Sequence, residues 1–156
     1  GMVVRYHHDE VGVNSRLDSI QAAILDCKLP HLDSYIASRQ RAAAFYDNAF
    51  AGNPHLLIPT RSADSTHVFH QYTLRLIDVD RDALRNALAE KGIPAMVYYP
   101  IPLHMQKAYQ DPRYQTGDFP VAEKLADCVL SLPMHTELDE EQLTYICNHV
   151  LAFVNQ

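Results

Sequence analysis

The chain has 156 residues, of which 47% are hydrophobic, and this length and composition suit one ordinary domain with its own core. Its formal net charge is −6 and its 13 basic residues are scattered, which argues against a nucleic-acid-binding surface. No apolar run approaches the roughly 20 residues of a membrane-spanning helix, and no secretion signal is recognisable. We therefore expect one cytoplasmic domain over residues 1–156 that binds small molecules or proteins, and neither nucleic acid nor membrane.

The cysteines give no sign of a disulfide framework. Cys27, Cys128 and Cys147 are odd in number, widely spaced, and placed within or beside apolar helical patterns. We expect three buried free thiols, with no disulfide and no zinc site.

The first predicted elements are two helical segments in series. Ser15 can cap a helix, with Asp18 three residues later as a weak capping-box acid, and apolar residues at helical spacing then extend it over about residues 15–29. Pro30 ends or kinks this helix. A mostly apolar helical stripe continues over residues 32–50.

Two strands with a short helix between them are predicted next. Apolar and polar residues alternate from Thr66 to Ile77, which indicates a strand. Asp78 or Asp80 then caps a short amphipathic helix that ends at Lys91-Gly92. A second strand is expected from Ala95 to Tyr99.

The last third begins with a long loop over residues 100–120, in which the prolines allow at most one helical turn. Pro120 suits the first position of the next helix. Residues 129–132 indicate a short strand, and Asp139 with Gln142 forms a capping pair for the last helix. The order predicts an α+β fold: a small, mostly antiparallel sheet covered by helices mainly on one face, with a long N-terminal helix or helix pair.

The start of the first predicted helix is a candidate anion site. Asn14 offers an amide donor, Arg16 a guanidinium, and the helix N-terminus its free backbone N–H groups. Together these groups suit a phosphate or a carboxylate. Most helix starts of this composition are only caps, so both interpretations stay open at this point.

A histidine metal site is a weaker alternative. His67 and His70 lie three residues apart on a predicted strand, so their side chains point to opposite faces and do not easily share one ion. One such histidine is more often hydrogen-bonded in the core while the other faces a cleft. His104 completes a site only if the long loop folds back over the strand.

Residues 98–104 form the third candidate, with the sequence YYPIPLH. Two phenols, a backbone stiffened by prolines and an imidazole are the groups that a sugar or nucleotide pocket uses for stacking and directional hydrogen bonds. The alternative is a proline-braced aromatic cluster that covers the end of the sheet.

These places, in this order, resemble the C-terminal region of the DegT/StrS-type sugar aminotransferases. The matching segments are GVNSRLDSIQAAIL, RAAAFY, HVFHQYTLRL, RDALRNALAEKGI, YYPIPLHMQKAY and LPMH. The resemblance implies the small C-terminal domain of a fold-type-I aminotransferase. It also implies transfer of an amino group from an amino acid such as glutamate to a keto-sugar nucleotide, with pyridoxal phosphate as cofactor, in surface-polysaccharide or amino-sugar biosynthesis.

The resemblance assigns roles to single residues. In the family, the asparagine of the G-x-N-x-R motif reaches across the dimer to the cofactor phosphate of the other subunit, which implies this role for Asn14, with Arg16 lining the same site. The Tyr-Pro-x-Pro-x-His segment lies near the sugar-nucleotide pocket, which implies substrate contacts for Tyr98, Tyr99 and His104. Family members often have histidine where Tyr98 stands. No residue of this chain receives a catalytic or metal-binding role.

The Schiff-base lysine and the cradle of the cofactor ring belong to the family's larger N-terminal domain. The lysines present, Lys28, Lys91, Lys107 and Lys124, do not resemble the Schiff-base motif. We therefore expect the large domain to be absent, the isolated chain to be inactive, and pyridoxal phosphate not to be bound by this chain alone.

The apparent start of the chain adds a further expectation. Gly1 directly before Met2 resembles the residue left by tag cleavage, so the encoded chain is expected to begin at Met2. A truncated reading frame, a separately produced domain, or a partner of a separately encoded N-terminal half would each explain this. The surface that normally packs against the large domain should then be uncovered and apolar, which predicts a homo-oligomer that buries the first helix. A stand-alone module that binds a nucleotide sugar or a protein is the alternative.

Overall fold

The computed structural model describes residues 2–156, so the expectation for Gly1 lies outside it. The helices are α1 (Ser19–Lys28), α2 (Leu32–Phe50), α3 (Arg81–Glu90), α4 (Pro120–Cys128) and α5 (Glu140–Val154), with short 3-10 turns η1 (Leu29–His31), η2 (Leu103–Met105) and η3 (Lys107–Tyr109). The strands are β1 (Met2–Val4), β2 (His7–His8), β3 (Leu56–Leu57), β4 (Tyr72–Leu76) and β5 (Val129–Leu132). The predicted α+β class is confirmed.

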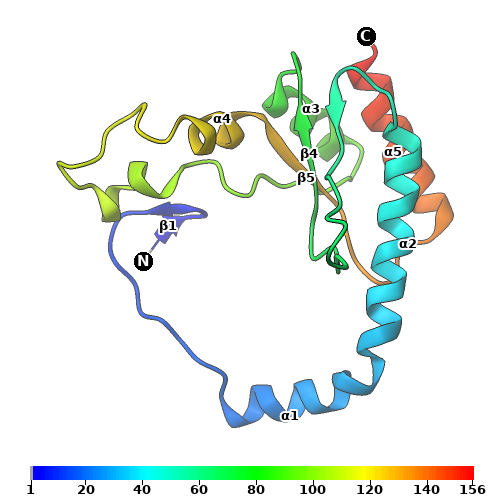
Figure 1. Ribbon diagram of the computed structural model, residues 1–156, viewed down its shortest axis with the longest axis horizontal. Coiled ribbons are helices and arrows are strands. Elements are labelled where there is room, and N and C mark those ends of the chain that lie inside the picture. Colours follow the sequence, from blue (N-terminus) through cyan, green and yellow to red (C-terminus); the bar gives the residue numbers. More distant parts are fainter. Residues whose placement is uncertain (1) are drawn as a thin grey trace.

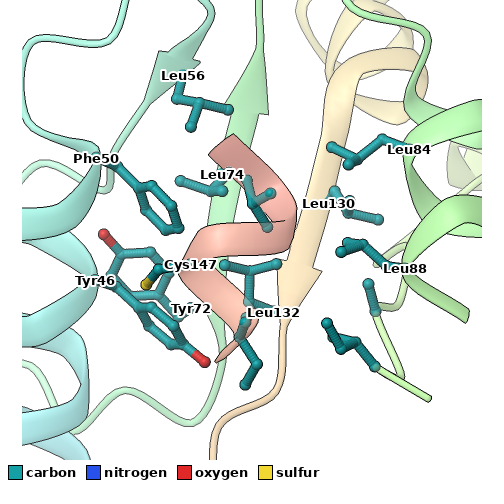
Figure 2. Packing of buried hydrophobic residues seen from close by; sticks show 14 of the residues in the cluster. Tyr46, Phe50, Leu56, Tyr72, Leu74, Leu84, Leu88, Leu130, Leu132 and Cys147 are labelled. Atoms are coloured by element: carbon teal, nitrogen blue, oxygen red, sulfur yellow. The ribbon is translucent and has the colours of Figure 1, made fainter. Parts of the chain in front are cut away.

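The central sheet has the strand order β3-β4-β5, and both of its pairings are antiparallel. The register places Leu74 opposite Leu130, so their side chains share the face on which the helices pack. On the other face the Thr73 and Ser131 hydroxyls lie 2.7 Å apart. The alternating burial of β4 fits a sheet covered mainly on one face, as predicted, whereas β5 is buried throughout. Figure 2 shows the leucines of the first face meeting the helices.

An aromatic cluster joins α2 to this sheet. Tyr46 and Phe50 stack with ring centroids 5.9 Å apart, and Tyr46 lies 4.9 Å from the ring of Tyr72 on β4. The Tyr46 hydroxyl donates to the carbonyl of Pro133 at 2.9 Å, which satisfies it inside the core. Burial raises the pKa of both phenols above the ordinary range for tyrosine.

The N-terminal helix pair forms an arm that leaves this core. Figure 1 shows α1 continuing through η1, which contains Pro30, into the long α2. None of the residues of α1 is buried. An extended segment over residues 9–18 leads back from α1 to the β1–β2 hairpin, which lies beside the loop after α3. The predicted helix pair is confirmed, and its first member is unpacked.

The predicted start of α1 is wrong by several residues. Asp18, rather than Ser15, is the N-cap: its carboxylate accepts from the Gln21 N–H at 2.8 Å, and the Gln21 side chain accepts from the Asp18 N–H at 3.2 Å. This reciprocal pair satisfies two backbone donors, and Gln21 is one of the two residue types that a capping box prefers at this position, whereas Ser15 would have only the shorter aspartate. Asn14 and Arg16 therefore lie before the helix, in the extended segment, and not at its N-terminus.

The two predicted strands are also shorter than expected. Phe69 is buried with φ at 48°, a left-handed conformation that ends extended pairing, so β4 starts only at Tyr72. From the predicted strand at 95–99, Met96 alone pairs, in an isolated bridge with Ser131. Pro94 and Pro100 flank that segment and lack the N–H that would extend the ladder.

The cysteine prediction is correct for the free thiols but not for their burial. Cys147 is buried, Cys128 is half-buried and Cys27 on α1 is exposed. Burial raises the pKa of Cys147 to about 12. None of the helices within residues 2–156 is both long and apolar enough to span a membrane.

Candidate functional site

Three tyrosines form a cluster beside the N-terminal hairpin. The ring of Tyr6 meets those of Tyr98 and Tyr99 edge-on, with centroids 5.8 and 5.3 Å away, and Tyr98 and Tyr99 lie 5.7 Å apart. Arg5 places its guanidinium 5.1 Å from the centre of the Tyr6 ring. Burial and a hydrogen bond with Tyr6 raise the pKa of Tyr98, so it remains a neutral phenol. We call Tyr6, Tyr98 and Tyr99 the tyrosine cluster.

The tyrosine cluster offers both apolar faces and polar edges. Tyr99 is 60% exposed, so much of its ring is free to contact a ligand. Edge-to-face packing supports each ring without covering it. The arrangement suits a sugar, which has hydroxyl groups on a puckered ring, or a base, which has a flat ring.

His104 lies apart from the tyrosine cluster and is held by α4. Its Nε2 is 3.0 Å from the Glu123 carboxylate, and its ring packs 4.7 Å from the ring of Phe119. Glu123 also accepts from the Gly117 N–H at 2.9 Å. These interactions, the Gly117 hydrogen bond foremost, hold the pKa of Glu123 below its ordinary value, so the carboxylate keeps its charge beside the imidazole.

A hollow of about 460 Å³ opens next to His104. Its walls come from the loop between α3 and α4 and from the start of α4: Pro102, Leu103, His104, Tyr109, Asp111, Tyr114, Phe119 and Ala122. Its lining is mostly apolar and aromatic, with His104 supplying an imidazole and Asp111 a carboxylate. Tyr98 and Tyr99 are not among the described residues that line this hollow. The YYPIPLH segment therefore builds two neighbouring features rather than one pocket.

Asn14 and Arg16 are exposed on the extended segment before α1. Arg16 donates to the carbonyl of its neighbour Ser15 at 3.5 Å. The helix-start argument for an anion site no longer applies to these residues, because α1 begins at Ser19. What remains is an exposed amide and an exposed guanidinium on the extended segment.

The histidine metal alternative finds no support in the geometry. His67 accepts from the Phe69 N–H at 2.8 Å, and His104 pairs with Glu123. Nowhere in the described part of the chain do three histidine, cysteine, aspartate or glutamate side chains gather as metal ligands would.

Sequence reasoning missed two polar residues that organise these features. Gln106 is 5% exposed and bonds to backbone atoms of residues 6, 8 and 101. Glu123 holds His104 and the turn at Gly117. A glutamine two residues after His104 and an acid in the first turn of a predicted helix were the available signals, but neither identifies a distant partner.

Comparison with known proteins places these features in a family. The model of the DegT/DnrJ/EryC1/StrS aminotransferase family matches residues 1–151. This chain belongs to that family. The family consists of pyridoxal-phosphate-dependent aminotransferases.

Relatives of the chain carry names from sugar-nucleotide chemistry and from regulation. The UDP-N-acetyl-3-dehydro-alpha-D-glucosamine 3-aminotransferase of Acidithiobacillus ferrooxidans is 49% identical over 90% of this chain. The pleiotropic regulatory protein of Geobacillus stearothermophilus is 44% identical over 98% of it. The matches cover 37% and 41% of those relatives, so the chain spans about two fifths of their length.

Solved structures of the family have the same fold. The crystal structure of Streptomyces venezuelae DesV in complex with a ketimine intermediate matches the whole chain with a TM-score of 0.84 and 36% identity. A family aminotransferase from Brucella abortus matches 99% of the chain with a TM-score of 0.79 and 35% identity. The chain covers 42% and 40% of those proteins.

Proposed function

We propose that this chain is the C-terminal portion of a sugar-nucleotide aminotransferase and forms one wall of its substrate site. The observation that carries this proposal is the family match over residues 1–151, with relatives named for UDP- and dTDP-sugar transamination. The complete protein would move an amino group from an amino acid such as glutamate to a keto-sugar nucleotide. Tyr98, Tyr99 and His104 would contact the nucleotide sugar.

Asn14 and Arg16 would contact the cofactor of a neighbouring subunit. An amide and a guanidinium are suitable donors for a phosphate, and both side chains stand exposed on the segment before α1. Bound pyridoxal phosphate supplies the carbonyl group that carries the amino group between donor and sugar. The role of this chain is to hold the phosphate end.

The lysines of this chain do not fit a covalent role toward the cofactor. All four are exposed: Lys28, Lys91, Lys107 and Lys124. A lysine that forms a Schiff base is activated by a desolvated pocket or a nearby cation, which an exposed side chain lacks. We propose that the isolated chain neither retains pyridoxal phosphate nor catalyses amino transfer, and that the missing groups belong to the rest of the protein.

We further propose that α1 mediates a homodimer. Ile20, Ile24 and Leu25 are 75%, 53% and 52% exposed, and α1 packs against nothing in its own core. In a two-fold antiparallel pairing, Asp18 at one end of α1 would approach Lys28 at the other end of the second copy, so the charges are complementary. This contact would also bring the Asn14 segment of one copy to the other.

Calorimetry tests the substrate wall. UDP-N-acetylglucosamine and dTDP-glucose should bind to the chain, and Tyr99→Ala should weaken binding by about tenfold because a supported aromatic face is lost. Tyr145→Ala on α5, where the tyrosine is 45% exposed, is the matched control and should bind as the wild type does. If neither nucleotide sugar produces a binding heat, Tyr98, Tyr99 and His104 do not form the proposed substrate site.

A stand-alone sugar-nucleotide-binding module is the second candidate. It is favoured by the fact that residues of this chain alone form the tyrosine cluster and line the hollow at His104. Micromolar binding by the chain alone, unchanged when the N-terminal portion of a relative is joined to it, would favour the module. Binding that tightens strongly after joining would favour the aminotransferase.

A further inference from the structure

Gln106 is a buried polar side chain that joins two segments almost 100 residues apart. It is 5% exposed, and with Ser131 it makes up the buried polar residues of the described chain. Its Oε1 accepts from the His8 N–H at 2.9 Å, and its Nε2 donates to the Tyr6 carbonyl at 2.8 Å and to the Ile101 carbonyl at 3.4 Å. Both ends of the amide are therefore satisfied.

This hydrogen-bond pattern reproduces the pairing of a neighbouring strand. The Tyr6 carbonyl and the His8 N–H flank residue 7, and in a parallel sheet the two would pair with the N–H and the C=O of one residue of the adjacent strand. The Gln106 side-chain amide presents the same donor and acceptor. It therefore docks the hairpin backbone in one register on the loop that follows Tyr98 and Tyr99.

Besides the ring contacts of Tyr6, few ties between the described residues hold the hairpin. β1 has three residues and β2 has two, and a hairpin of this size is marginal by itself in water. Lys107 and Asp9 form a second tie at 3.2 Å, but their side chains are 71% and 47% exposed. Exposed ion pairs contribute little to stability. Gln106 is thus the buried polar tie between the hairpin and the loop among the described residues.

We propose that Gln106 is a positioning residue for the sugar-nucleotide site, because it holds the hairpin so that Tyr6 braces Tyr98 and Tyr99. Tyr6 has φ at 66°, and its carbonyl is the one that Gln106 binds. Its ring contacts both tyrosines. Without the brace, these rings sample more rotamers and must be ordered when the ligand binds. This inference rests on the proposed function for its ligand, while its structural part stands apart from it.

Gln106→Met is the informative variant, since methionine fills similar space without donor or acceptor. Gln106→Glu is the second variant, because a carboxylate can accept from His8 but cannot donate to Tyr6 or Ile101. Gln110→Met and Gln110→Glu are matched controls at an exposed position of the same loop. Circular dichroism is recorded first, and each variant should keep the helical signal of the wild type before the variants are compared.

The first readout is nuclear magnetic resonance of the chain with labelled tyrosine rings. In the wild type, we expect nuclear Overhauser effects between Tyr6 and Tyr99 and slow exchange of the His8 amide. The contacts between the rings should be lost in both Gln106 variants, and the slow exchange of the His8 amide should be lost in Gln106→Met, which has no acceptor. Both signals should be kept in the two Gln110 variants, with the thermal midpoint of the core unchanged. Persistence of the ring contacts in Gln106→Met would overturn the proposal.

The second readout is calorimetry with UDP-N-acetylglucosamine and dTDP-glucose. The Gln106 variants should bind about three- to tenfold more weakly, since each loosened side chain must be ordered on binding. Unchanged affinity alongside lost ring contacts would also overturn the proposal, because Gln106 would then hold the hairpin without serving the site. If the wild type itself does not bind, the proposed function fails, and this outcome is distinct from a wild type that binds and variants that bind equally well.

Discussion

Arg39 on α2 ties three separate backbone positions together. Its Nη1 donates to the carbonyls of Phe69, His70 and Met134 at 3.0, 3.1 and 3.2 Å. These carbonyls have no strand partner, since β4 starts only at Tyr72 and β5 ends at Leu132. One charged side chain therefore replaces the ladder at the end of the sheet.

We expect Arg39→Met to lower the free energy of unfolding by about 2 to 3 kcal/mol, because charge-assisted hydrogen bonds to partly buried carbonyls are lost. Arg41→Met on the same helix is the control: Arg41 is exposed, bonds to Ser38 at 3.1 Å, and its loss should cost less than about 0.5 kcal/mol. Urea unfolding followed by circular dichroism measures both. Equal costs for the two variants would contradict the account of Arg39.

Candidate site residues could be predicted from the sequence where they belong to a local motif. Residues whose hydrogen-bond partners are distant in the sequence could not. The donors at Asn14 and Arg16 and the phenols at 98 and 99 are recognisable from neighbouring residues. The bond from Gln106 to Tyr6 spans 100 positions, and no periodicity or spacing predicts it. Nor does any local pattern predict the hydrogen bond that turns His104 toward Glu123.

At the level of elements, α1 and α5 begin with the same device in different surroundings. Asp18 and Asp139 each form a capping box with a glutamine three residues on. The helix that follows Asp139 carries five buried residues, whereas the helix that follows Asp18 carries none. Removing the capping aspartate should therefore affect the stability of the fold at α5 but not at α1.

Asp139→Ala should lower the global free energy of unfolding by about 1 kcal/mol, the usual cost of a lost N-cap. Asp18→Ala should fray α1 and leave the global value unchanged, because α1 contributes no packing to the core in one copy of the chain. Urea unfolding at low protein concentration gives the global value, and amide exchange reports the fraying. A global cost for Asp18→Ala equal to that of Asp139→Ala would show that α1 packs on the core.

Elements with caps and clear periodicity were predicted well from the sequence. α3 with Asp80 as its cap, β5 and α5 have nearly the expected bounds. The alternation that predicted a strand from Thr66 failed because tertiary contacts decide that segment. Arg39 and the left-handed Phe69 hold it in a non-extended path, and neither is visible in a local pattern.

The molecule as a whole is an open ring in which one side consists of α1 and the extended segment (Figure 1). The core lies on the opposite side, around the sheet and α5. An exposed apolar helix that projects from a core is typical of a surface that binds another protein or a second copy of the chain. The extended segment before α1 carries the proposed phosphate contacts, Asn14 and Arg16.

We expect the chain to self-associate through α1. Ile24→Glu should shift it toward the monomer, because a charge would be buried in the apolar contact. Val121→Glu is the control: Val121 is 72% exposed on α4, outside the proposed contact, and the variant should associate as the wild type does. Sedimentation velocity over a range of concentrations measures the effect. A wild type that stays monomeric throughout would remove the proposed dimer.

We propose that this chain completes a cofactor site shared between two subunits, and a chimaera tests this proposal. The N-terminal portion of the Acidithiobacillus ferrooxidans relative, of which this chain matches 37%, is joined ahead of the chain and assayed for amino transfer. Asn86→Ala, on the exposed face of α3, serves as the control for Asn14→Ala.

The decisive measurement mixes two inactive chimaeras, one lacking the Schiff-base lysine of the relative and one carrying Asn14→Ala. Random pairing makes half of the dimers mixed, and each mixed dimer holds one intact site, so about a quarter of the activity should return. An Asn14→Ala chimaera as active as the Asn86→Ala control, or a mixture that stays inactive, would contradict a shared site.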